Sequence, residues 1–362
     1  MAQTTISTAN RVKQWDAKAH REYVRSNRFK RYMGTSQNSI IMLQEDLTKK
    51  RGDAVTCPLL GALDSSAGYN DGSTDLVGNE KALPNDGHQI SIGVVRDATL
   101  VNVEEEQASP VNIRNAGKQA LKDLQMRYLR NDLIEAFGSI AGVAYGSATE
   151  TNKDAWLATN SDRVLFGASG ANNSGNDHSA SLLNVDTASD KLSRDIVSRM
   201  KRMAQTASNV NGDGIRPYRF GEDEETYVMF VDALSYRDLK ADMSTVHTDA
   251  EKRGKMNPLF TGTTSLYWDG VVVREIPEIA SLGAVGASSA TVSPVYLCGT
   301  QALGVAWAKR TTTTVRKEDD YGFKYGVGFM ELRGVDKMLY GSGTSGKQWG
   351  MVTGYVAAAA DG

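Results

Sequence analysis

The sequence lacks any run of about eighteen consecutive apolar residues, so it predicts no membrane-spanning helix. Its first residues, MAQTTISTANRVKQW, also lack the apolar core of a secretory signal peptide. We therefore expect neither secretion nor insertion into a membrane. The product should stay in a cytoplasm, at least at first.

Cysteine is scarce, with 2 residues in 362. Cys57 and Cys298 lie far apart in apolar stretches, which indicates buried thiols rather than a disulfide framework or a zinc site. Histidine is almost as rare, and no second ligand stands at metal-binding spacing from any copy. We interpret each histidine as an ordinary surface or core residue. The 4 histidines are His20, His88, His178 and His247.

One segment near the C-terminus, YGSGTSGKQW, has the spacing of a phosphate-binding loop. Gly341, Gly346 and Lys347 fit G-x-x-x-x-G-K, but Gln348 stands where Ser or Thr is needed to hold Mg²⁺. The remaining chain, residues 348–362, is too short for a helix and a further parallel strand. We interpret the segment as a Gly/Ser turn between two strands. A nucleotide hydrolase that uses Lys347 and Asp232 is the alternative.

The segment NVNGDG, residues 209–214, resembles the start of a calcium-binding loop. Its twelfth position holds Phe220 where a bidentate glutamate is required. We interpret it as a turn between a helix and a strand.

The sequence offers no other arrangement typical of catalysis, since it contains no G-x-S-x-G motif. Acidic clusters at 104–106, 222–225 and 318–320 are interpreted as solvated faces or salt bridges between subunits. We therefore assign no catalytic residue, no cofactor-binding residue and no metal ligand, and we expect no cofactor and no enzymatic activity.

The overall composition is that of an ordinary soluble protein, with 40% hydrophobic and 23% charged residues. The length favours two domains. The net charge of -2 gives no reason for the whole surface to attract nucleic acid. Residues 11–31 are locally basic and have helical apolar spacing, so they predict an arm that contacts DNA, a membrane surface or an acidic neighbour.

An extended hairpin is predicted between residues 52 and 103. Val55, Cys57 and Leu59 alternate on one limb, and apolar residues alternate again from Ile90 to Val94. Between them lies a long segment rich in Gly, Asn, Asp and Ser. A two-stranded ribbon is only marginally stable by itself in water, so we infer that another subunit covers it.

Two helices are predicted after this hairpin. Ser109 has the character of an N-cap and Pro110 of a first helical residue, and the apolar spacing continues to a terminator at Gly138. That span is about 40 Å long. A second helix is predicted to begin at Thr187 or Ser189, after a loop at 167–179.

The C-terminal half is predicted to consist mainly of strands. Residues 226–232 form a buried run followed by a short helix, and Asp269-Gly270 between apolar arms predicts a hairpin. Further strands are predicted at 295–298, 303–308, 323–332 and 351–356.

The order of these elements resembles the major capsid protein of tailed bacteriophages, the Hong Kong phage fold, in the subgroup of N-four-like short-tailed phages. Six stretches in the same order carry the resemblance, and they span most of the chain. They are FKRYMGTSQNSII (29–41), KKRGDAVTCPLLGAL (49–63), LVGNEKAL (76–83), NPLFTGTTSLYWDGVVVRE (257–275), LCGTQALGVAWAK (297–309) and DDYGFKYGV (319–327).

The resemblance implies an α+β major capsid fold, a function as the head protein of a tailed phage, and self-assembly into pentamers and hexamers of an icosahedral shell. An encapsulin-like cellular shell is the alternative of the same fold. The implied domains are an N-terminal arm (1–50), an E-loop (51–108), a peripheral domain with a spine helix (109–219), an axial domain (220–305) and strands returning to the peripheral domain (306–362).

The same resemblance implies the partners and the location. The partners are other copies of the chain, together with a scaffolding protein, a portal, a decoration protein and packaged double-stranded DNA bound without sequence specificity. No membrane partner is implied. The implied location is the virion, after assembly in the host cytoplasm.

Overall fold

The structure is a computed structural model that describes residues 24–45, 53–66, 68–69, 72, 75–109, 112–219, 225–244, 265–319, 321 and 323–360. The chain divides into two compact units. The first unit comprises Met1–Asn27, Val94–Leu129 and Lys309–Leu332, and the second comprises Arg28–Gly93, Arg130–Ala308 and Arg333–Gly362.

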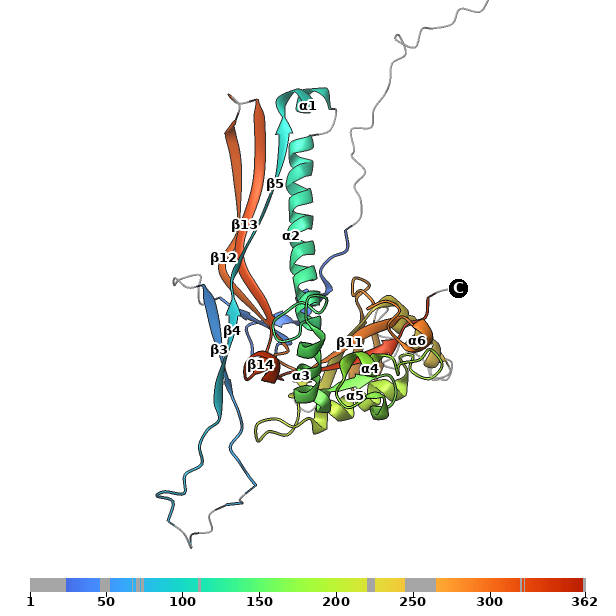
Figure 1. The fold of residues 1–362 in the computed structure, drawn as a ribbon. Coiled ribbons are helices and arrows are strands. Elements are labelled where there is room, and N and C mark those ends of the chain that lie inside the picture. The colour runs from blue at the N-terminus through green and yellow to red at the C-terminus, as the bar shows by residue number, and fades with distance from the viewer. Residues whose placement is uncertain are drawn as a thin grey trace, which may run out of the picture. The chain divides into compact units, whose positions relative to one another are not determined.

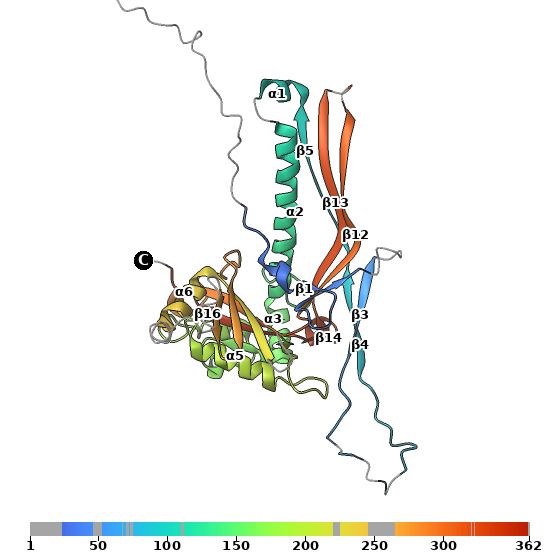
Figure 2. The same cartoon turned by 180° about the vertical axis from the view of Figure 1, so that it is seen from behind.

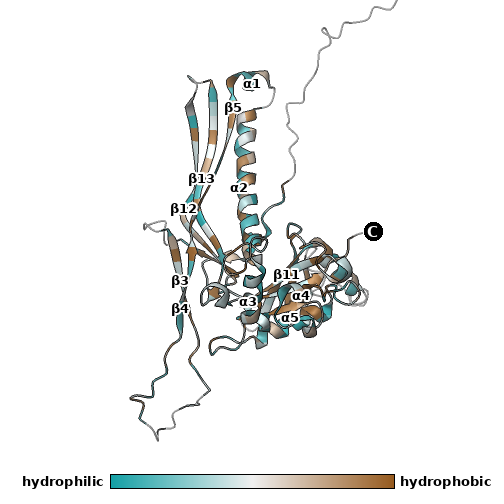
Figure 3. Cartoon of the chain, in the orientation of Figure 1, coloured by the Kyte–Doolittle hydropathy of each residue, from teal (hydrophilic) through white to brown (hydrophobic). Residues whose placement is uncertain are grey.

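The first unit combines strands with the beginning of a long helix. Strand β13 (Lys324–Lys337) lies between β12 (Leu303–Asp319) and β5 (Gly93–Asn102) in the sheet order, and Figure 1 shows these strands alongside helix α2 (Ile113–Gly138). Leu121 of the helix packs against Val327 and Phe329 of β13 in a small apolar core. Because only one stripe of the helix is covered, α2 carries both teal and brown residues in Figure 3.

The predicted start of this helix is wrong, although its end at Gly138 is confirmed. Ser109 caps the C-terminus of a separate short helix, α1 (Val103–Ala108), and its amide donates to the carbonyl oxygen of Glu105. Ser109 is extended, as expected for a residue before proline, so helical geometry cannot continue through it. Asn112 acts as the N-cap of α2, because its Oδ1 accepts from the Asn115 amide at 3.0 Å. Pro110 lies outside the described residues.

Within the described part of the second unit, seven strands form one mixed sheet in the order β6-β16-β11-β8-β10-β9, with β7 paired to β8. Side chains of a strand alternate between the two faces of a sheet. One face of this sheet packs on α5 (Arg194–Thr206) and α6 (Ala233–Asp242), and Figure 2 shows α5 against it. The other face packs on α3 (Glu150–Asn160) and α4 (His178–Leu182). The strands are β6 (Val164–Phe166), β7 (Tyr218–Arg219), β8 (Glu225–Val231), β9 (Ser265–Trp268), β10 (Val271–Glu275), β11 (Val292–Cys298) and β16 (Met351–Ala357).

The second unit also contains the chain's first described strands. Strand β1 (Met33–Gly34) pairs with β2 (Ile41–Gln44), which runs parallel to the start of β12. Phe29 precedes them and is fully buried, with its ring 5.0 Å from that of Phe230 and 5.6 Å from that of Phe137. Phe29, which lies within the predicted arm, is therefore part of the core. Residues 1–23 lie outside the described residues.

Most predicted strands are confirmed, and one further helix boundary is corrected. The predicted start at Thr187 or Ser189 is wrong, because Ser193 caps α5 by accepting from the Ile196 amide. Asp186 instead accepts from the amides of Ala188 and Ser189 and closes a separate turn. Strands β12 and β13 are longer than predicted, and α3 and α4 were not predicted. Strands β6 and β16 join the sheet from outside residues 220–305.

Within the described part of the chain, no helix combines the length and the apolar character needed to span a bilayer.

Candidate functional site

The predicted hairpin is present, and its base is held in the core of the second unit. Its second limb is shorter than predicted, because it ends at Ser91 and the following β5 pairs with β13 in another sheet. Strand β3 (Ala54–Leu60) pairs antiparallel with β4 (Asn85–Ser91), with Cys57 opposite His88. The side chains of Val55, Cys57 and Leu59 are buried and pack with Ile90. The alternation of residues therefore fixes which face of the ribbon is covered.

Residues 61–84 connect the two strands and are here called the hairpin loop. Its described residues run on from the strands as extended chain (Figure 1). The Nζ of Lys81 donates to the carbonyl oxygens of Asp64 at 2.7 Å and Gly68 at 2.9 Å, and so ties the two limbs together. The large apolar side chains of the loop are nevertheless exposed. They are Leu63 (51%), Tyr69 (89%), Leu76 (64%), Val77 (87%) and Leu83 (50%).

A second set of exposed apolar side chains lies on the first unit. Val94 and Leu100 project from β5, Val315 projects from β12, and Tyr321 and Phe323 lie in the connection between β12 and β13. Gatherings of exposed apolar residues in a soluble protein mark interaction surfaces. Each unit thus presents apolar side chains that the described part of the chain leaves in contact with solvent.

The phosphate-loop-like segment is a turn between two strands, as predicted. Strands β14 (Leu339–Tyr340) and β15 (Lys347–Gln348) pair antiparallel around it, and β16 follows rather than a helix. Lys347 donates to the hydroxyl of Ser208 and lies 3.6 Å from a carboxylate oxygen of Asp162. Asp232, the other half of the nucleotide-site hypothesis, is the N-cap of α6. Neither side chain takes part in a phosphate-binding loop.

The calcium-loop-like segment is a turn between α5 and β7, again as predicted. Asn209 donates to the carbonyl oxygen of Gly214 across the turn, and Ser208 forms an isolated bridge with Asp213. Asn211 donates to the carbonyl oxygen of Ala62 at 3.3 Å, which attaches one end of the hairpin loop to this turn. Phe220 lies outside the described residues.

Arg163 is fully buried beside this turn and joins three segments. Its Nη2 donates to the carbonyl oxygen of Ser208 at 2.7 Å, its Nη1 donates to the carbonyl oxygen of Gln348, and Asp162 lies 3.3 Å from Nη2. These hydrogen bonds satisfy a charge that would otherwise be costly to bury. The residue thus links these three segments of the fold.

Both described histidines and both cysteines are buried, as predicted for core residues. The Nε2 of His88 lies 3.4 Å from a carboxylate oxygen of Asp336. His178 is enclosed by the rings of Tyr145, Trp156, Phe166 and Tyr355. Burial lowers the pKa of its imidazole to about 4, with the nearby ammonium of Lys153 acting in the same direction. Cys57 and Cys298 are free thiols, and His20 and His247 lie outside the described residues.

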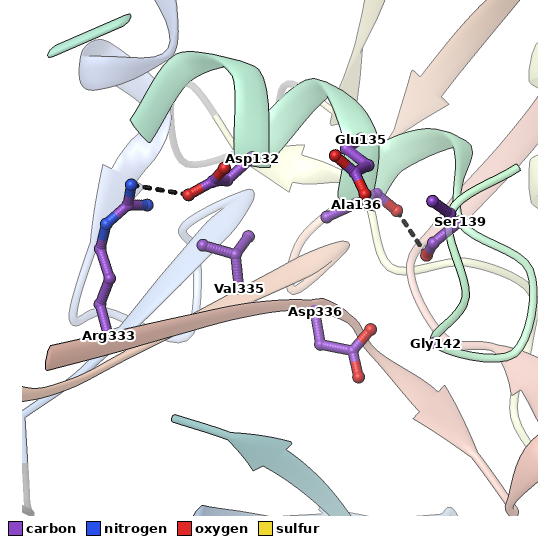
Figure 4. Close-up of a pocket in the computed structure, with 9 residues that line it drawn as sticks. Asp132, Glu135, Ala136, Ser139, Gly142, Arg333, Val335 and Asp336 are labelled. Carbon is purple, nitrogen blue, oxygen red and sulfur yellow. Dashed lines mark hydrogen bonds and ion pairs between the residues drawn. The ribbon is translucent and has the colours of Figure 1, made fainter. Parts of the chain in front are cut away.

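A pocket of about 200 Å³ lies between the C-terminal turns of α2 and strand β13, and Figure 4 shows the residues that line it. Asp132 and Arg333 form an ion pair at 2.6 Å on one side, and Asp336, already beside His88, lines the other. Small-molecule sites are mostly apolar with a few converging polar groups. This pocket is instead lined by charged groups, and Asp132, Arg333 and Asp336 among them have partners within the chain.

Comparison with known proteins identifies the fold. A sequence model of the family described as "Phage capsid protein" matches residues 3–360. The capsid structure of cyanophage Pam1 is similar with 34% identity and a TM-score of 0.87 over 100% of both chains. No curated protein sequence matches.

More distant similarity extends to other phage heads. The capsid of Ralstonia phage GP4 is 18% identical with a TM-score of 0.75 over 100% of both chains. The head of Helicobacter pylori bacteriophage KHP40 is 12% identical with a TM-score of 0.69, over 97% of this chain and 96% of that one.

These matches confirm the α+β Hong Kong phage-type fold and describe a structural protein of the virion rather than an enzyme. Self-association into a shell follows from them. The chain belongs to the phage capsid protein family, as a major capsid protein of a tailed bacteriophage.

Proposed function

We propose that this capsid protein forms the pentamers and hexamers of a closed icosahedral shell, and that its hairpin loop lies on a neighbouring copy. The observation that supports this proposal is the exposure of the loop's apolar side chains in the single chain, where Tyr69 is 89% and Val77 87% exposed. The described residues of this loop form no strand or helix, and a long segment of that kind is costly to order unless a partner covers it.

The energetics favour a closed assembly. Each apolar side chain that the loop buries on a neighbour contributes about 25 cal/mol per Å² of covered surface. One such contact is weak, but every copy both donates a loop and receives one. Many weak contacts that form together around a closed shell reinforce one another through multivalency, so interfaces of small area can stabilise the particle.

The domain roles follow from the same proposal. The hairpin lies in the E-loop (51–108), α2 serves as the spine of the peripheral domain (109–219), and residues 220–305 contribute the axial domain at fivefold and sixfold centres. The shell encloses double-stranded DNA, assembly takes place in the host cytoplasm, and scaffolding, portal and decoration proteins are further partners.

Contacts with the packaged DNA are proposed to be independent of sequence, since containment requires no base readout. The basic segment 11–31 is the candidate. Four of its described members are exposed, namely Arg25, Arg28, Lys30 and Arg31, and Arg28 lies 3.6 Å from a carboxylate oxygen of Glu275.

The hairpin loop can be tested by removing its apolar contacts without touching the core. The double variant Tyr69→Ser, Val77→Ser should unfold at the wild-type temperature as a single chain, because both side chains are exposed there. Its yield of closed particles in negative-stain microscopy should fall by about tenfold or more. Leu183→Ser is the matched control, since Leu183 is 60% exposed but lies at the end of α4. Wild-type particle yield from the double variant would contradict the loop's role.

The N-terminal arm needs a deletion that spares the core. Phe29 is buried, so removal of residues 1–23 is preferable to a longer truncation. We expect fewer or irregular particles from the truncated chain. Shells of normal size and yield would show that the arm is dispensable for assembly.

A further inference from the structure

Three carboxylates converge on one side of the second unit, on the helices α3 and α4. Glu150 and Asp154 lie one turn apart on α3, so they share a face of that helix. Asp177 is the N-cap of α4. One oxygen from each of the three carboxylates lies within 4.8 Å of the others.

Hydrogen bonds orient two of these carboxylates. Asp154 Oδ1 accepts from the backbone amide of His178 at 2.8 Å. Asp177 Oδ1 accepts from the Ala180 amide at 2.8 Å and from the Ser179 hydroxyl at 2.9 Å. Since one oxygen of each group is held by the protein, the arrangement is built into the fold rather than a chance meeting of flexible side chains.

The charge of the cluster is only partly balanced. Lys153 Nζ lies 3.4 Å from Glu150 Oε2, and the same ammonium sits 4.6 Å from the ring centroid of Tyr145. One ammonium against three carboxylates leaves an excess of two negative charges among these groups. A divalent cation would neutralise that excess and relieve the mutual repulsion of the acids.

An independent observation comes from His178. Its side chain is 1% exposed, and neither ring nitrogen has a hydrogen-bond partner among the described residues. Its Nδ1 lies 3.9 Å from Glu150 Oε1, on the side of the ring that faces the cluster. Buried polar atoms are rarely left without a partner, so an orphaned imidazole nitrogen beside three acids indicates a missing ligand.

We propose that Glu150, Asp154 and Asp177 bind a calcium ion that links α3 to α4, and that a water molecule on this ion donates a hydrogen bond to Nδ1 of His178. Oxygen ligands surround Ca²⁺ at about 2.4 Å, so opposite ligands stand about 4.8 Å apart, whereas Mg²⁺ requires about 4.2 Å. The three carboxylate oxygens lie within 4.8 Å of one another, and Ca²⁺, which accepts an irregular shell of oxygen ligands, suits ligands from two separate helices better than Mg²⁺, which demands a near-ideal octahedron. Glu150 is 44% exposed on its side chain, which leaves a path for the ion from solvent.

Binding to the folded chain stabilises it by mass action, so the proposal gives the capsid protein a calcium-dependent stability. This inference does not depend on how copies assemble, because all four residues belong to one unit of one chain. It can therefore be tested on the unassembled protein, and its failure would leave the shell function untouched.

Terbium luminescence provides a direct test, because Tb³⁺ occupies calcium sites and is sensitised by nearby aromatic rings. Trp156 and Tyr145 lie 6.3 Å and 5.7 Å from the His178 ring. The purified full chain should give saturable luminescence with Tb³⁺ alone, and Ca²⁺ should displace it at lower concentration than Mg²⁺. Glu150→Gln, Asp154→Asn and Asp177→Asn should each weaken binding by about tenfold or more. Asn at position 177 retains the capping function.

Asp186→Asn is the matched control, since Asp186 also accepts backbone amides in a turn of the same unit but lies outside the cluster. This variant should bind Tb³⁺ as the wild type does. In a second measurement, the wild-type unfolding temperature should be higher in Ca²⁺ than in EDTA, and Glu150→Gln, at a half-exposed side chain, should lose that difference. Absence of saturable binding, unchanged binding in the three variants, or equal displacement by Mg²⁺ would overturn the calcium site.

Discussion

Lys337 Nζ donates a hydrogen bond of 2.7 Å to the carbonyl oxygen of Ser139. Lys337 itself is only 2% exposed. Its ammonium group also lies 5.8 Å from the ring centroid of Trp156. Burial lowers the pKa of Lys337 to about 7, while Asp336 opposes that shift. The end of β13 thus carries a lysine that loses its charge near neutral pH.

This lysine should make stability depend on pH. Because its pKa is lower in the folded chain than in the unfolded chain, the unfolded state binds more protons above about pH 7. The cost of burying the charge is fully present below pH 7 and is relieved as pH rises. The free energy of unfolding of the wild type, relative to Lys337→Met, should increase by up to about 1.4 kcal/mol per pH unit above pH 7.

Urea unfolding of the unassembled chain from pH 6 to pH 9 would measure this difference. Lys240→Met is the control, since Lys240 is exposed on α6 and should show no such trend. A wild-type to Lys337→Met difference that is the same at every pH would contradict the prediction.

Arg163 and Lys347 contact the same turn but should differ greatly in importance. Arg163→Met leaves the carbonyl oxygens of Ser208 and Gln348 without their donor and should cost about 3 kcal/mol or more in unfolding free energy. Lys347→Met removes a partly exposed ion pair with Asp162 and should cost less than about 1 kcal/mol. Denaturant unfolding of the two variants would check this order, and equal costs would refute it.

Gly350 should not tolerate a side chain. A Cβ there would overlap the carbonyl oxygen of Thr300 and press on the backbone of Ala302, neither of which can swing away. Gly350→Ala should therefore lower the unfolding free energy by about 3 kcal/mol. Gly146→Ala is the control, because a Cβ at that position would meet no described atom within 4 Å and its backbone is not left-handed. Differential scanning calorimetry should show a large drop in unfolding temperature for Gly350→Ala alone.

Phe29 should anchor the chain's N-terminal region to the sheet of the second unit. Phe29→Ala removes a fully buried ring from its contacts with Phe230 and Phe137, and should cost about 3 to 5 kcal/mol. Phe323→Ala, at a ring that is 43% exposed, should cost much less. Similar unfolding temperatures for the two variants would show that Phe29 contributes little to the core.

Local chemistry made much of the fold predictable. The alternation of apolar residues predicted β3 and β4, and Asp269-Gly270 predicted the turn between β9 and β10. The glycines after Lys347 argued against the helix that a phosphate-binding loop requires, and strand β16 follows there. Helix starts were less predictable because several residues nearby could act as caps. Ser109 and Ser189 have the right side chains, but Asn112 and Ser193 hold the capping positions.

The proposed calcium site could not be predicted from the spacing of acidic residues in the sequence. Glu150 and Asp154 are i, i+4 neighbours on a helix that the residue pattern did not predict, and Asp177 follows a long loop. No local motif joins them. Their meeting depends on how α3 and α4 pack on the sheet, and on the aromatic enclosure that strips His178 of solvent.

The order of residues alone predicted most of the strands and carried the resemblance to phage capsid proteins, since turn chemistry, apolar alternation and the succession of elements are local properties that need no tertiary contacts. Only the folded chain decided which charges are buried, which hydrophobic side chains stay exposed, and where carboxylates gather. These depend on contacts between segments distant in sequence. Packing sets the solvation of each group, and solvation sets its charge and its need for a partner.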